Sequence, residues 1–157
     1  MTSRERVLCA IAHGEPDKVP IDLGAMRSTG ITAVAYGYLK KYLGLSAGST
    51  DVYDVVQQLA QPEDPILDYF EADVIDIGRA FLTADEDWKD FTLPDGSAAK
   101  IPTYAGFEPD GSGGWLVRSA DGMIIGSMPE GAYYLSQTHF PLLEWDGEDL
   151  GVLDRLP

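Results

Sequence analysis

The residue best placed to do chemistry is Arg27, in a loop that spans residues 24–32. The loop follows an apolar run, 19–23, that is typical of a β-strand. A guanidinium there can hold an anionic group of a substrate or cofactor, because it presents its N–H donors in a planar fork. The other interpretation is a loop arginine paired with Asp22 or with a carboxylate at an interface. The sequence leaves both open.

Two further side chains are candidates for contact with a substrate. Asp22 lies within the apolar run, where a charged residue needs a partner. Neutralisation of Arg27 is favoured over the role of an acid inside the fold. His139 lies in a Gln-Thr-His-Phe-Pro loop and could contact a ligand, although a surface role is the commoner one.

Other motifs do not make a site. Cys9 and His13 have the spacing of two metal ligands on one helix face, but two ligands are too few. A buried small thiol and a histidine at a helix end are favoured instead. The glycines of the run 111–114 are predicted to lie in a hairpin turn, so they do not form a phosphate loop between a strand and a helix. No Ser/His/Asp or Cys/His nucleophile arrangement is evident.

The elements that must position these residues alternate up to residue 78. Thr2 and Glu5 predict a capping box at the start of a helix that Gly14 ends. Its apolar stripe is Val7, Leu8 and Ile11. A second helix is predicted over 32–43, with Gly44 ending it. The residues on one of its faces are Val34, Tyr38 and Tyr42.

The next elements complete this alternating pattern. Apolar residues at helical spacing favour a short helix over 51–60, and Pro62 begins another that is followed by a strand over 74–77. The buried face of the helix after Pro62 is predicted to be Ile66, Leu67 and Phe70. Strands that alternate with helices indicate βα units and a parallel sheet.

The pattern changes after Trp88. Three Asp-Gly pairs, at 95–96, 110–111 and 121–122, are typical of tight hairpins. The antiparallel strands that they predict are 91–93, 99–103, 114–118 and 123–127. The tail 147–157 is predicted to begin another helical element.

Composition bounds the class of protein. The 157 residues are 45% hydrophobic and 10% aromatic, which suffices for a packed core, and the single cysteine excludes an internal disulfide framework. Neither a membrane span nor a leader peptide is evident, so a cytoplasmic protein is expected. Residues 1–61 hold six basic and six acidic residues, whereas 62–157 hold five and twenty and carry the whole net charge of −15. Such a surface repels nucleic acid and anionic lipid.

The segment TSRERVLCAIAHGEPDKVPIDLG, residues 2–24, resembles the amino-terminal signature of the uroporphyrinogen decarboxylase superfamily. Met26 and Arg27, with Gly30 and Tyr36 following, are similar to its Met-Arg-Gln-Ala-Gly-Arg-Tyr loop. The run that begins at Phe70, FEADVIDI, resembles its Phe-Gly-x-Asp and apolar strand. The Asp-Gly hairpins and the segment MPEGAYY look like an insertion of its methyltransferase-like members.

The resemblance implies a fold and a site. The fold is α/β, the amino-terminal part of a (β/α)8 TIM barrel with an inserted antiparallel β-hairpin region, since a whole barrel needs about 250 residues. Residues 1–157 would be a single partial barrel domain, with βα units over 1–86, the insertion over 87–135 and the next unit over 136–157. Arg27 would be catalytic and bind substrate. The other residues implied to contact substrate are Asp22, Tyr36 and His139.

Departures from the family pattern bear on the reaction. Ile31 stands where true decarboxylases have a second arginine, and Ala80 where they have a central aspartate. A methyltransferase that moves a methyl group between a small substrate, a corrinoid protein and a thiol or tetrahydrofolate is therefore favoured. The alternatives are uroporphyrinogen decarboxylase and a non-catalytic acidic binding module or split subunit.

The same resemblance sets the cofactors and partners. This segment is expected to bind no cofactor itself. In a longer enzyme, zinc and a corrinoid would serve as cofactors, and the zinc ligands would lie beyond Pro157. The expected partners are a small-molecule substrate, a corrinoid protein, and a second copy or complementing chain. Neither nucleic acid nor membrane is expected.

Overall fold

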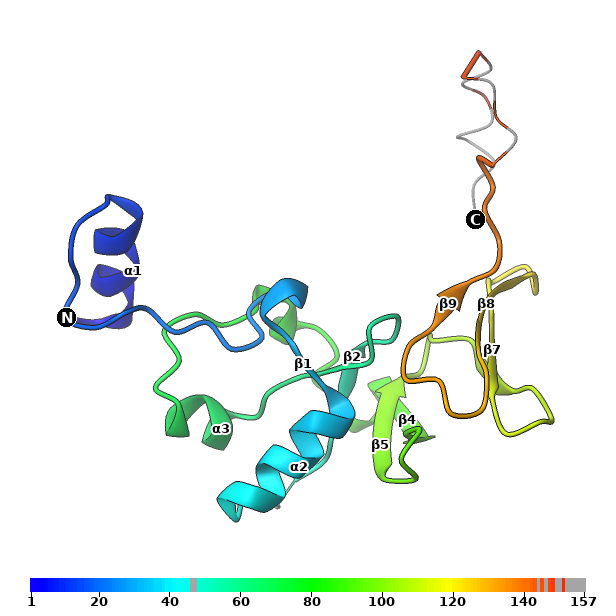
Figure 1. Ribbon diagram of the computed structural model, residues 1–157, viewed down its shortest axis with the longest axis horizontal. Coiled ribbons are helices and arrows are strands. Elements are labelled where there is room, and N and C mark those ends of the chain that lie inside the picture. The colour runs from blue at the N-terminus through cyan, green and yellow to red at the C-terminus, as the bar shows by residue number, and fades with distance from the viewer. Residues whose placement is uncertain (46–47, 144, 146, 149–150, 152–157) are drawn as a thin grey trace. The chain divides into compact units, whose positions relative to one another are not determined.

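The computed structural model describes residues 1–45, 48–143, 145, 147–148 and 151 (Figure 1). Its contacts divide the chain into two compact units, Met1–Thr103 and Tyr104–Pro157. Within the described ranges, no helix combines the length and the apolar character needed to span a membrane.

The first helix, α1 (Ser3–Ile11), begins with the predicted capping box. The Glu5 amide donates to Thr2 Oγ1 at 3.2 Å, and the Thr2 amide donates to Glu5 Oε2 at 2.9 Å. The expected apolar stripe is not buried: Leu8 and Ile11 are 46% and 70% exposed. The buried residue of α1 is Arg6. Polar contacts of Arg6, rather than an apolar face, therefore hold this helix in place.

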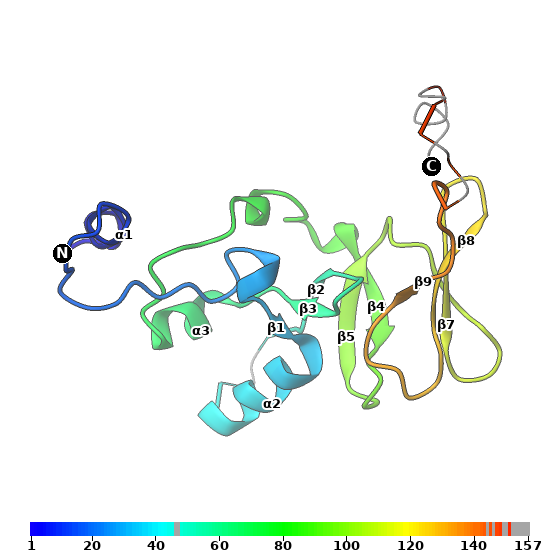
Figure 2. The ribbon, with the colours of Figure 1, turned by 45° about the horizontal axis from the view of Figure 1, so that its top comes forward.

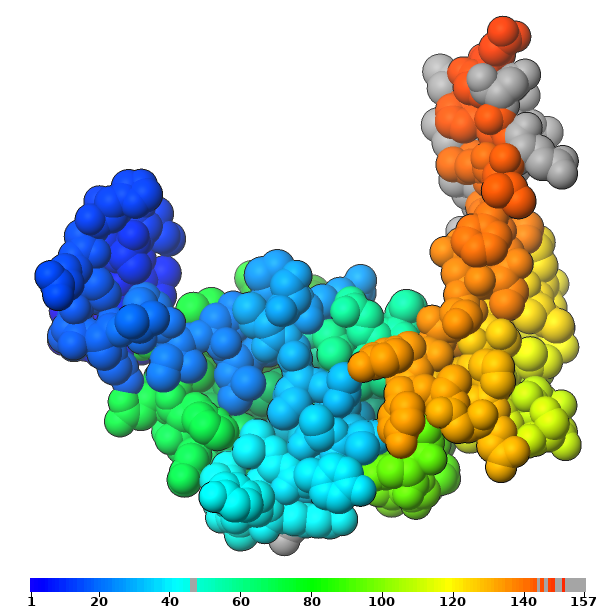
Figure 3. All heavy atoms as spheres, in the orientation of Figure 1, coloured from blue at the N-terminus to red at the C-terminus, as the bar shows by residue number. Residues whose placement is uncertain are grey.

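The second helix, α2 (Ala33–Leu43), confirms the predicted span and its ending. Gly44 follows it at φ 69°, a left-handed conformation that glycine adopts without steric cost. The buried residues of α2 are Ala33, Tyr36 and Lys40. The predicted face is on the other side, since Tyr38 and Tyr42 are exposed, and Figure 3 shows α2 in cyan lying open at the surface.

The segment 51–60 is not a helix, contrary to the expectation from its spacing. It forms β2 (Val52–Asp54) and β3 (Leu59–Ala60), and β3 pairs antiparallel with both β2 and β1 (Ile31–Thr32). Asp54 explains the difference, because its carboxylate accepts the amides of Val56 and Gln57 and turns the chain. Gln58 completes the turn at φ 54°.

Helix α2 and the hairpin over 88–102 contact this small sheet, whereas α1 lies away from it (Figure 2). Helix α3 (Asp64–Tyr69) buries Ile66 and Leu67 as predicted. The hairpin of β4 (Trp88–Thr92) and β5 (Ala98–Pro102) lies beside β2. Short 3-10 turns are η1 (Arg27–Thr29), η2 (Ile77–Ala80) and η3 (Asp85–Asp87). The most deeply buried side chains here are Tyr36, Val52, Ile66 and Ile101.

The second unit is an antiparallel meander, which confirms the prediction of hairpins. The strands are β6 (Phe107–Pro109), β7 (Trp115–Arg118), β8 (Ile124–Met128) and β9 (Ser136–Gln137), paired in chain order. Gly111 and Gly122 adopt the positive φ angles that their turns require. Val117 and Met128 are buried. The predicted helical tail lies almost wholly outside the described residues.

The prediction that the chain forms the amino-terminal part of a (β/α)8 barrel is wrong. All three sheets that the structure describes are antiparallel, and parallel pairing occurs only as isolated bridges, Asp22 to Val74 and Asp51 to Lys100. Two residues prevent the bridge between Asp22 and Val74 from extending into a parallel ladder. Pro20 has no amide hydrogen to donate to a ladder. Asp76 accepts the Gly78 amide at 2.8 Å and begins η2, which ends the extended run.

Candidate functional site

Asp22 shapes the loop that carries Arg27. Its Oδ1 accepts hydrogen bonds from the Ala25 amide at 2.9 Å and the Thr29 hydroxyl at 3.0 Å. The Gly24 amide closes the loop by donating to the Thr29 carbonyl at 3.0 Å. The Asp22 carboxylate therefore has its hydrogen-bond partners within the loop itself. The favoured expectation, that it neutralises Arg27, is wrong.

The carboxylate that neutralises Arg27 is Asp54. Arg27 Nε lies 2.8 Å from Asp54 Oδ2, and the Asp54 side chain is only 2% exposed while that of Arg27 is 71% exposed. Asp54 Oδ1 also accepts the amides of Val56 and Gln57, both at 2.9 Å. The guanidinium is thus tethered along one edge and open to solvent along the other. An open, oriented fork of this kind suits a carboxylate, sulfonate or phosphate.

Tyr53 precedes Asp54 in β2, and its hydroxyl lies within range of the charges of Asp54 and Arg27. Its hydroxyl is buried and has no hydrogen-bond partner among the described residues. Burial raises the pKa of Tyr53, and the negative charges of Asp54 and Asp76 raise it further, against the opposing effect of Arg27. The phenol therefore stays protonated at neutral pH, as a donor. We call Arg27, Tyr53 and Asp54 the Arg27 site.

Tyr36, expected to bind substrate, lies in the core instead. Its hydroxyl donates to Glu63 Oε2 and accepts the Glu63 amide, both at 2.9 Å, and its side chain is fully buried. Lys40 Nζ donates to the same Glu63 oxygen at 2.8 Å and to the Ser49 carbonyl at 2.7 Å. Burial raises the pKa of Tyr36. This cluster ties α2 to Glu63, the N-cap of α3, and keeps the Tyr36 hydroxyl in the core, away from any substrate.

His139 belongs to the second unit. It is partly buried, and its carbonyl accepts a hydrogen bond from Gln137 Nε2 at 2.6 Å. Among the described residues, its imidazole forms no hydrogen bond or ion pair with another residue predicted to contact substrate. Within the first unit, Arg27, Asp22 and Tyr36 are each placed by separate contacts, so these three residues do not form one cluster.

The residues that carried the family resemblance meet in an ion cluster at the N-terminus. Arg6 Nε and Nη2 donate to the two Asp17 oxygens at 2.7 and 3.0 Å, while Nη1 contacts Asp73. Asp73 also accepts the Ile21 amide at 3.0 Å. That backbone hydrogen bond and Arg6 hold the pKa of Asp73 below its usual range. The segments 2–24 and 70–77, which carried the resemblance, thus share a structural role, because Arg6 and Asp73 join them.

Sequence reasoning placed Arg27 in its loop but missed Tyr53 and Asp54. Both lie in the segment assigned to a helix, so neither was expected to face the loop. The run Val-Tyr-Asp, followed by two valines and two glutamines, is also compatible with a strand and a turn, and this pattern was the signal that could have located them. In the part of the chain that the structure describes, no three His, Cys, Asp or Glu residues gather as metal ligands do.

Comparison of the chain with protein-family models, with curated proteins and with solved structures gave no match.

Proposed function

We propose that this chain forms the anion-recognising part of a cytoplasmic enzyme that moves a methyl group between a small substrate, a corrinoid protein and a thiol or tetrahydrofolate, the reaction to which its resemblance to the uroporphyrinogen decarboxylase superfamily points. The observation that carries the proposal is the Arg27 site. An exposed guanidinium is oriented by a buried carboxylate, next to a buried phenol that lacks a partner among the described residues. A buried polar group without a partner calls for one, and a bound ligand can supply it.

Each residue of the Arg27 site has a distinct role in this proposal. The open edge of Arg27 binds the anionic group of a thiol substrate and fixes its orientation. The Tyr53 hydroxyl donates a hydrogen bond to the same ligand. Asp54 binds no substrate and positions the guanidinium. The zinc ion that the resemblance implies has no matching donor set among the described residues, so no step is assigned to it.

The decarboxylase alternative has less support. Its substrate carries several carboxylates and pyrrole nitrogens, which need more than one cation and a central acid. Ile31 lies in β1, paired with Ala60, and Ala80 lies in η2. Neither side chain can supply such a group. Release of carbon dioxide from uroporphyrinogen by the purified protein would favour this alternative over methyl transfer.

Replacing Arg27 with Ala is expected to weaken binding of mercaptoacetate, a small thiol with a carboxylate, by at least about tenfold. Arg27→Lys should recover part of the loss, because lysine keeps the charge but not the fork. The melting temperature should fall as well, because the nearly buried Asp54 carboxylate loses its counter-charge and keeps only the amides of Val56 and Gln57. Titration calorimetry measures the affinity, and loss of methylcobalamin absorbance in the presence of mercaptoacetate measures methyl transfer.

A matched control is Arg118→Ala, which removes another exposed arginine that is paired with a carboxylate, Glu108. It should leave mercaptoacetate binding unchanged. Tyr53→Phe should weaken binding without altering the ion pair. Equal affinity of wild type and Arg27→Ala would contradict the assigned role of Arg27. Binding without methyl transfer would contradict the reaction and leave the anion site standing.

A further inference from the structure

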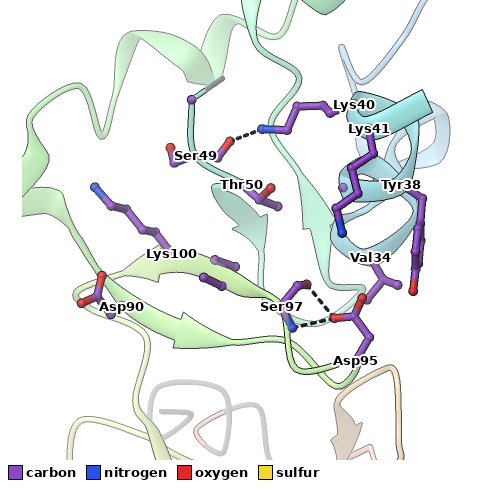
Figure 4. A pocket seen from close by; sticks show the side chains of 14 residues that line it. Val34, Tyr38, Lys40, Lys41, Ser49, Thr50, Asp90, Asp95, Ser97 and Lys100 are labelled. Atoms are coloured by element: carbon purple, nitrogen blue, oxygen red, sulfur yellow. Dashed lines mark hydrogen bonds between the residues drawn. The ribbon is translucent and has the colours of Figure 1, made fainter. Parts of the chain in front are cut away.

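A cleft of about 300 Å³ lies in the first unit, away from the residues of the Arg27 site. Its walls come from α2, from the segment 48–50 and from the β4–β5 hairpin (Figure 4). The volume is at the lower end of the range for small-molecule sites. A ligand for it must therefore be small.

One wall is open because of a glycine in the middle of α2. A Cβ built at Gly37 would meet no atom within 4 Å, its own helix backbone aside. Glycine is a poor helix former and alanine a good one, so neither packing nor helix stability accounts for glycine here. The other apolar lining residues are Val34, Ala98 and Ala99. Together they give this part of the cleft an apolar lining.

The charged residues that line the cleft are Lys40, Lys41, Lys100, Asp90 and Asp95. Lys40 is already paired with Glu63, and Figure 4 shows Lys100 and Asp90 on the side away from Lys41 and Asp95. Lys41 and Asp95 face the space without neutralising each other. Lys41 Nζ lies 5.5 Å from the centroid of the Tyr38 ring, and Asp95 Oδ1 accepts the Ser97 amide and hydroxyl at 3.0 and 2.6 Å. No ion pair joins Lys41 and Asp95 in the described structure, yet their side chains point toward one another (Figure 4). The Ser97 hydroxyl chiefly, and Lys41 to a lesser degree, hold the pKa of Asp95 below its usual range.

We propose that this cleft binds a free α-amino acid with an aliphatic side chain. The carboxylate of the ligand pairs with Lys41, its ammonium pairs with the outer oxygen of Asp95, and its side chain lies against Val34 and the open backbone of Gly37. A zwitterion matches the facing charges, whereas an anion alone would meet Asp95 and a cation alone would meet Lys41. Charge-assisted hydrogen bonds at both ends give the selectivity.

Three ligands that differ only in their charged groups test the proposal by titration calorimetry. Leucine carries both groups, isocaproate lacks the ammonium and isoamylamine lacks the carboxylate. Leucine is expected to bind at least about tenfold more tightly than either analogue, which is the loss of one charged hydrogen bond. Absence of leucine binding would overturn the proposal. Equal binding of isocaproate and leucine would also overturn it, in favour of a simple anion site.

Single substitutions test which residue binds each charged end of the ligand. Lys41→Gln should weaken leucine and isocaproate but not isoamylamine, and Asp95→Asn should weaken leucine and isoamylamine but not isocaproate. Matched controls outside the cleft are Lys18→Gln and Asp68→Asn, which should change no affinity. Leucine binding that is unaltered by both Lys41→Gln and Asp95→Asn would place the ligand elsewhere and overturn the proposal.

Substitutions at Gly37, in the open wall of the cleft, provide an independent test. Gly37→Leu should abolish leucine binding by filling the space, while Gly37→Ala should weaken it severalfold and raise the melting temperature. If Gly37→Leu fails to fold, Gly37→Ala alone still decides, because a loss of affinity in a more stable protein requires occupation of the cleft. Full affinity in Gly37→Ala would contradict contact of the ligand with this wall.

Discussion

Replacing Glu63 with Gln is expected to lower the free energy of unfolding by about 3 kcal/mol, the low end of the range for breaking a buried ion pair. The Lys40 side chain is 6% exposed and that of Glu63 29% exposed, so the neutral variant leaves a nearly buried ammonium without its counter-charge. Tyr36 loses the charged acceptor of its hydroxyl in the same variant. Urea denaturation followed by circular dichroism measures the change.

Two further variants calibrate this result. Tyr36→Phe removes two hydrogen bonds but no charge, so a smaller loss of about 1–3 kcal/mol is expected. Glu71→Gln is the matched control, because Glu71 also pairs with a lysine, Lys18, but is 74% exposed. It should leave stability unchanged. A Glu63→Gln protein as stable as wild type would show that Lys40 does not depend on this carboxylate.

Replacing Asp73 with Asn is expected to destabilise the first unit and to reduce the dependence of its stability on pH. The Asp73 side chain is 1% exposed and joins Arg6 to the Ile21 amide. Asparagine keeps a carbonyl acceptor for one of these donors but leaves Arg6 with only Asp17 as a charged partner. Thermal and urea unfolding at neutral pH measure the loss.

The direction of the pH effect follows from the lowered pKa values of Asp73 and Asp17. The Ile21 amide and Arg6 lower that of Asp73, and Arg6 and the terminal ammonium lower that of Asp17. Their contribution is complete above the unfolded pKa of about 3.9 and is lost as the pH falls through the folded values. The stability difference between wild type and Asp73→Asn should therefore shrink below about pH 4. A difference independent of pH would contradict the ionised role of Asp73.

Local features of this fold could be predicted from the sequence. The capping box of Thr2 and Glu5, the left-handed Gly44 and the Asp-Gly turns each depend on a few neighbouring residues. Their chemistry is decided within one turn of chain, so the pattern is sufficient. The position of Arg27 in a loop could be predicted for the same reason.

Features that depend on distant residues could not be predicted. The spacing of the apolar residues in 51–60 fits a helix, but pairing of β3 with β1 and the turn at Asp54 override it. The face of α2 was assigned by its aromatic residues, whereas contact with Glu63 buries Lys40 and exposes Tyr38. The partner of Arg27 was missed because Asp54 reaches it only through that same sheet.

The ion pair of Arg6 with Asp73 joins residues 67 positions apart, whereas the strands of the second unit pair with their neighbours in the chain. Closing a long loop costs more entropy than closing a hairpin. A helix of nine residues such as α1 is also unstable in isolation. We therefore expect α1 to dock only after Asp73 has been synthesised, as a late step of folding.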